Sequence, residues 1–160
     1  MTIKDTGIAL ALMCLWGLNF SAIKLGANET DPILLTALRF TFAVLPAVFF
    51  VKRPKGVSKF LVLYGLVFGL GVWGMMIWSV NLGVSAGMAP LMMNMSLISS
   101  LVLGYLVFNE SMTSYKVMGA VLAIGGLVIS LMLGDGSFPL AALPLTLIAA
   151  LSWSFLSVIF

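Results

Sequence analysis

Long apolar runs separated by short polar connections constrain this chain more than any other feature. The runs cover residues 7–26, 33–51, 60–80, 86–108 and 115–133, and a sixth extends over 139–160. A helix rises about 1.5 Å per residue, so roughly 20 apolar residues are needed to cross the hydrocarbon core of a bilayer. The connections are rich in polar, Gly or Pro residues, as loops are. The pattern predicts an all-α membrane protein, a bundle of six transmembrane helices.

Composition excludes a water-soluble fold. Hydrophobic residues make up 62% of the 160 positions and charged residues 8%, against roughly 45–50% and about 25% in ordinary soluble domains. A soluble domain of this length leaves about a third of its extended-chain surface exposed. Eight basic and five acidic side chains could cover little of that surface. The lipid bilayer is therefore the expected partner of these apolar runs.

The distribution of charge predicts the orientation of the chain. Lys4, the basic cluster in residues 52–59 and Lys116 fall on one side of the predicted spans. The connections on the other side contain only acidic charges, at Glu29, Asp31 and Asp135. Because Lys and Arg are retained in the cytoplasm, we expect a multi-pass membrane protein with a cytoplasmic N-terminus. The net charge of +3 then reflects topology, and no nucleic-acid partner is expected.

The residue types needed for enzyme chemistry are lacking. The chain has no histidine and a single cysteine, Cys14, so no metal-ligand set or disulfide is expected. Residues 83–87 match the Gly-x-Ser-x-Gly pattern of a serine nucleophile, but no histidine base is available to it. No phosphate-binding Walker A motif occurs. We therefore expect no enzyme activity and no cofactor.

Two segments of the chain align with each other around a tryptophan. Residues 10–16 match residues 147–153, which places Trp16 over Trp153. The segments lie in the first and the sixth run, so the second enters the membrane in the opposite direction to the first. Inverted repeats of this kind build many secondary transporters, with the substrate site near the midplane. The last run ends at Phe160 without a closing loop, and we expect the natural protein to be longer.

Several segments also resemble the EamA-type drug/metabolite transporter superfamily. They are residues 10–20 (LALMCLWGLNF), 38–40 (LRF), 53–54 (RP), 104–110 (GYLVFNE) and 119–126 (GAVLAIGG). The resemblance covers the whole chain and rests on the order and spacing of these segments. It implies that residues 1–133 form a first five-helix EamA repeat and residues 139–160 the first helix of a second, inverted repeat. The remaining C-terminal half of that architecture would be missing here.

The resemblance also implies a function. Such proteins export amino acids and related metabolites, of the O-acetylserine and cysteine kind, across the bacterial inner membrane by alternating access. The alternative is a non-transporting membrane subunit, or a half-size scaffold, whose intramembrane polar residues only hold helices together. Gly65 with Gly69, and Gly83 with Gly87, form Gly-x-x-x-Gly pairs that favour close helix packing and a possible homodimer.

Arg39 is the most informative candidate for a small-molecule site. It lies about three residues from the middle of the second run, roughly 4.5 Å along a helix. A charge at this depth is costly, and the planar guanidinium suits a substrate carboxylate in a wet cavity. The alternative is that Arg39 extends toward Glu29 or Asp31, or fixes a helix contact.

Four further residues are candidates to line a cavity. Trp16 and Asn19 stand three positions apart and share a helix face, so they could offer an aromatic wall and an amide. Asn94 lies near the middle of the fourth run, one turn after Pro90, and Trp73 lies within the third run. For Asn19 and Asn94, hydrogen bonding between packed helices is the alternative.

The group that would carry a proton during transport is unknown. No histidine occurs, and no Asp or Glu lies well inside the five complete runs. Glu110 falls at the cytoplasmic end of the fourth run, where pairing with Lys116 is the favoured interpretation. Tyr64 and Trp78 lie near opposite ends of the third run and are expected to belong to the interfacial aromatic belts.

Overall fold

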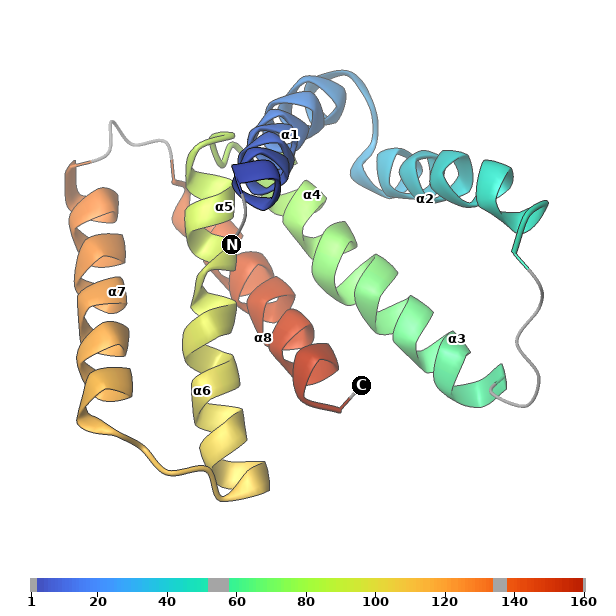
Figure 1. Cartoon of the computed structure of the whole chain (residues 1–160). Helices are drawn as coiled ribbons and strands as arrows, with labels where there is room; N and C mark the ends of the chain where they lie inside the picture. The colour runs from blue at the N-terminus through green and yellow to red at the C-terminus, as the bar shows by residue number, and fades with distance from the viewer. Residues whose placement is uncertain (1–2, 52–57, 134–137, 160) are drawn as a thin grey trace.

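The computed structural model describes residues 3–51, 58–133 and 138–159, and every regular element in these ranges is helical (Figure 1). The elements, in chain order, are α1 (Ile3–Glu29), α2 (Pro32–Val48), α3 (Ser58–Leu66), the π-helix η1 (Val67–Gly74), α4 (Met75–Asn81), α5 (Met88–Met93), α6 (Met95–Phe108), α7 (Ser114–Leu133), the 3₁₀ turn η2 (Leu140–Ala142) and α8 (Leu143–Ile159). The elements α3, η1 and α4 follow one another without a gap, as do η2 and α8, so each group forms one span. The absence of any strand in the described ranges confirms the predicted all-α fold.

Five of the described helical segments are long and apolar enough to cross a membrane: Lys4–Glu29, Lys59–Asn81, Met88–Phe108, Ser114–Leu133 and Leu140–Val158. The sixth, α2, has 17 residues, which is at the short end of the range for a membrane span. The prediction that this span continues to residue 51 was wrong. Pro46 lies in its last turn, and residues 49 and 50 form a turn in which the N–H groups of Phe50 and Val51 both donate to Ala47 O.

Two of the spans depart from regular α-helix. The fourth predicted span is divided at Asn94, whose N–H is shared between the carbonyls of Pro90 and Leu91, both at 3.2 Å. Pro90 has no N–H of its own to donate, which weakens the preceding turn. In the third span the N–H of Met75 donates to Leu70 O, five residues back, as in a π-helix. Such widened turns are frequent at functional sites.

Most of the buried apolar side chains lie toward one end of the bundle. They come from the second half of α1, from η1, α4, α5 and the connection between α4 and α5, and from the first half of the last helix: Phe20, Ile23, Ala27, Val72, Trp73, Met76, Ile77, Val80, Val84, Met88, Ala89, Met92, Ala142 and Ala149. Figure 1 shows α3, α6 and α8 diverging toward the opposite end. We call the packed end the closed end and the other the splayed end.

At the closed end, α1 and α4 cap each other. Asn81 Nδ2 donates to Ala27 O at 2.7 Å, and Lys24 Nζ donates to Val80 O at 3.2 Å. The last carbonyls of a helix have no partner within the helix, and a cation near them is favoured by the helix dipole. These two hydrogen bonds, which we call the Lys24–Asn81 clasp, therefore join the first and third spans at one point.

The last helix, α8, packs against both the third and the fourth span. Ser154 is fully buried, and its Oγ donates to Ser96 O on α6 at 2.7 Å. On the other side, a Cβ added at Gly71 of η1 would lie 2.7 Å from Ser152 Oγ. Only glycine at position 71 permits this approach. By contrast, α7 has no buried residue and stands at the edge of the bundle, beside α6 (Figure 1).

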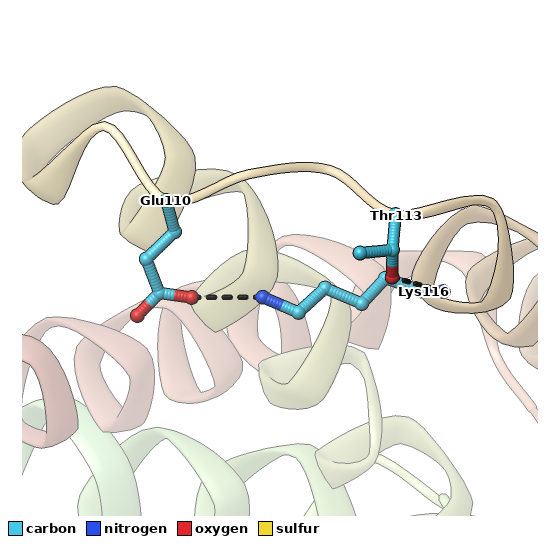
Figure 2. Close-up of polar contacts among 3 residues, drawn as sticks. All are labelled: Glu110, Thr113 and Lys116. Carbon is cyan, nitrogen blue, oxygen red and sulfur yellow. Dashed lines mark hydrogen bonds and ion pairs between the residues drawn. The ribbon is translucent and has the colours of Figure 1, made fainter.

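The connection between α6 and α7 contains an ion pair. The chain leaves α6 at Asn109, which has a left-handed φ of 53° that asparagine tolerates. Figure 2 shows Lys116 Nζ donating to Glu110 Oε2 at 2.9 Å and the Lys116 N–H directed at Thr113 Oγ1. The predicted Glu110–Lys116 pairing is confirmed. Both side chains are exposed, so the pair contributes only about 0–1 kcal/mol.

The Gly-x-x-x-Gly pairs do not make close helix contacts in the described chain. A Cβ at Gly65 would meet no atom within 4 Å, and one at Gly69 would meet only Phe40, at 3.9 Å. Gly83, with φ of +117°, and Gly87 both lie within the connection between α4 and α5 and share no helix. Packing at Gly83 and Gly87 was predicted wrongly, and the homodimer stays a prediction.

Four of the charged residues used to predict the orientation fall outside the described residues. They are Lys52, Arg53 and Lys55 of the basic cluster, and Asp135.

Candidate functional site

A cavity of about 350 Å³, widely open on one side, lies among α1, α2, η1 and α8, with the lining residues Leu12, Leu15, Trp16, Asn19, Arg39, Trp73 and Trp153. We call it the central cavity. Ligand pockets in proteins typically enclose about 300–1,000 Å³, so a small metabolite is of suitable size. Trp16 is the middle residue of α1, and Arg39 is the eighth of the 17 residues of α2. The cavity is therefore near half depth of the spans.

Four of the five residues singled out in the sequence meet at this cavity. Trp16 and Asn19 come from α1, Arg39 from α2 and Trp73 from the π-helix η1. The fifth, Asn94, does not line it and is exposed at the break between α5 and α6. The structure thus brings together an amide, a guanidinium and indole rings, all from different spans except the pair on α1.

Arg39 lies between α1 and η1. Its Nη2 donates to Asn19 Oδ1 at 3.2 Å, and its Cζ lies 4.7 Å from the ring centroid of Trp73, a cation–π contact. Nη1 is buried and has no hydrogen-bond partner among the described residues. A guanidinium has five N–H donors, so most of its hydrogen-bonding capacity is unused in this arrangement.

No carboxylate within residues 3–51, 58–133 and 138–159 forms an ion pair with Arg39. Asp31, one of the two partners considered from the sequence, caps α2 instead: its Oδ1 accepts from the N–H groups of Ile33 and Leu34 at 2.9 and 3.2 Å. A half-buried cation without an acid partner is costly in an apolar surrounding. An anion bound in the cavity would offset that cost and fill the unused donors.

The chain belongs to the EamA-like transporter family. It matches that family over residues 6–132, which is most of its length. It is 35% identical over 156 residues to a "Probable amino-acid metabolite efflux pump" of Salmonella typhimurium, and 34% identical to the protein of the same description in Escherichia coli. Each alignment covers 96% of this chain and 52% of the relative.

A further relative, from Archaeoglobus fulgidus, is described as an "Uncharacterized transporter" and is 35% identical over 129 residues, 76% of this chain and 46% of the relative. This EamA-family chain thus spans about half the length of the curated relatives it matches. No solved structure matches it. Membership of this family and the five long apolar helices of the described chain support a multi-pass membrane protein.

The structure adds one residue to the central cavity that the sequence did not indicate as a candidate. Trp153 of α8 lines the central cavity, and its ring centroid lies 6.3 Å from that of Trp16. The only sequence signal was the alignment of Trp153 with Trp16. Tyr64, predicted as a belt residue, stacks on Phe68 at 5.7 Å and lines a second cavity, whereas Trp78 is 44% exposed and lines neither.

Proposed function

We propose that this chain is the substrate-binding unit of a secondary transporter that exports amino acids or closely related metabolites, such as O-acetylserine and cysteine. The observation that supports it best is Arg39, a cation at the centre of a span, lacking an acid partner in the described chain and lining a cavity of about 350 Å³. Two relatives described as probable amino-acid metabolite efflux pumps support the same substrate class.

Binding of an amino acid follows from the chemistry of the lining. The carboxylate pairs with Arg39, and the amide of Asn19 holds the guanidinium in place. No Asp or Glu among the described residues lines the cavity, so the ammonium group rests against the indole face of Trp16. The rest of the wall, Leu12, Leu15 and Trp153, is apolar and accepts a small aliphatic side chain.

Export also needs a direction. Lys59 and Lys116 lie in the first turns of α3 and α7, and both helices start toward the splayed end (Figure 1). Under the positive-inside rule, we expect that end on the cytoplasmic side of the bacterial inner membrane. The closed end, with the Lys24–Asn81 clasp, then faces outward. In alternating access, substrate enters from the splayed end, and release outward requires the first and third spans to separate at the clasp.

The curated relatives are about twice as long as this chain. We propose that transport needs a second five-helix unit in the inverted orientation, which completes the walls of the cavity. The aligned tryptophans Trp16 and Trp153 support this arrangement, because they would be equivalent residues of the two units, and here they meet at one cavity. The proton-carrying group, if one is used, has no candidate in the described spans.

The direct test is transport by the full-length protein. Proteoliposomes loaded with a labelled mixture of the common amino acids and O-acetylserine should release at least one of them faster than protein-free vesicles do. Release is measured by mass spectrometry of the external buffer over time. Counterflow, in which external unlabelled substrate accelerates exchange, separates a carrier from a leak. If no member of the mixture is released above the protein-free rate, the proposal is contradicted.

A further inference from the structure

Trp153 lies between two cavities. It lines the central cavity together with Arg39, and it also lines a second cavity of about 460 Å³ with Tyr64, Phe68, Leu156 and Ser157. The second cavity lies toward the splayed end, between α3, η1 and the last turns of α8. Among the residues that the structure describes, Trp153 is the one that the two linings share.

Aromatic contacts hold the indole of Trp153 in this position. Its ring centroid lies 6.3 Å from that of Trp16 and 5.9 Å from that of Phe68. Phe68 in turn lies 6.4 Å from Trp73, edge to face. Aromatic pairs at such separations attract each other beyond simple burial. The rings therefore form a continuous partition across the middle of the bundle.

The backbone on both sides of Trp153 is fixed as well. Ser152 lies against Gly71, where no Cβ could be accommodated without displacement, and buried Ser154 donates to Ser96 O at 2.7 Å. Because the residues on both sides pack this closely, the backbone at Trp153 is held in place, and the indole can move only by a change of side-chain rotamer. The position of the partition is thus set by the packing of α8 against η1 and α6.

From this geometry we propose that Trp153 is the specificity-determining residue of the transporter, a partition that limits the size of the substrate side chain. The inference rests on the proposed function. With the carboxylate held at Arg39, the side chain of the amino acid meets the indole of Trp153. Small residues fit the central cavity, and aromatic amino acids are excluded. Shortening Trp153 joins the two cavities and gives large side chains a place.

The test compares small and large substrates in the full-length protein. Efflux of alanine, cysteine and phenylalanine is measured in proteoliposomes for the wild type and for Trp153→Ala and Trp153→Leu. We expect the ratio of phenylalanine to small-substrate efflux to rise at least about tenfold in both variants. A single methylene group in a pocket already changes selectivity by about 10–200-fold. Trp153→Leu keeps an apolar side chain in the gap, should Trp153→Ala fold poorly.

Trp78→Ala is the matched control, because Trp78 is another large indole that lines neither cavity. Its efflux ratio should equal that of the wild type. If the wild type transports and the Trp153 variants transport with an unchanged ratio, the specificity role is wrong while the proposed function stands. If the wild type itself transports no amino acid, the proposed function fails and this inference fails with it.

Discussion

Replacing Arg39 with methionine should reduce amino-acid efflux by at least about 30-fold, because loss of a charge-assisted hydrogen bond to substrate costs roughly 2 kcal/mol or more. Methionine is of similar length and apolar, so it can keep the contact with Trp73 while removing every donor. The efflux rate of the full-length variant in proteoliposomes, per amount of folded protein, measures the effect.

The same variant separates binding from helix packing. If Arg39 only joins α1 to α2 through Asn19, an apolar replacement of similar volume is expected to be neutral or even stabilising, and transport should persist. We expect the melting temperature of Arg39→Met to equal or exceed that of the wild type. Lys116→Met, which removes an exposed cation far from the central cavity, is the control and should transport normally. Normal efflux by a folded Arg39→Met protein would contradict a role in substrate binding.

Replacing Gly71 with valine should destabilise the protein more than replacing any other glycine of the third span with valine. The first added carbon would lie 2.7 Å from Ser152 Oγ and 3.2 Å from Ser152 Cβ. Overpacking of this kind costs roughly 1–3 kcal/mol, which corresponds to a fall in melting temperature of about 2–12 °C. Efflux should fall in parallel, because α8 carries Trp153. Thermal unfolding in detergent, followed by circular dichroism, measures the shift.

Gly65→Val is the matched control, since it is the same change six residues earlier in the same span and a Cβ there meets no atom within 4 Å. It should leave the melting temperature within about 2 °C of the wild type. Ser152→Gly removes the atoms that a Cβ at position 71 would strike, and it should recover most of the stability lost by Gly71→Val. An equal loss at Gly65 and Gly71, or no rescue by Ser152→Gly, would contradict the close approach of α8 to η1.

Hydropathy predicted the helices well because the length of an apolar run is set by the bilayer. It could not predict where a helix is broken or widened, since that depends on backbone hydrogen bonds. Pro90 signalled a disturbance in the fourth span, and the break follows at Asn94. Nothing in the run around Gly69 and Gly71 distinguished a π-helix from an α-helix.

The site could be predicted only in part, for a related reason. Arg39 and Asn19 stood out because polar groups are costly inside a membrane. Spacing along one helix says which residues share a face, but the neighbouring helix that this face meets follows from tertiary packing. For that reason Asn94 lies away from the cavity, whereas Trp153 of α8 lines it.

Three of the four tryptophans of this chain, Trp16, Trp73 and Trp153, line the central cavity, so a carboxylate that binds there should change their fluorescence. The measurement is a titration of full-length Trp78→Phe protein with an amino acid that it exports and with the carboxamide of that amino acid. We expect a saturable change with the acid, binding of the amide at least about 30-fold weaker, and no such preference in Arg39→Met. Equal affinity for acid and amide in the presence of Arg39 would contradict carboxylate recognition at this site.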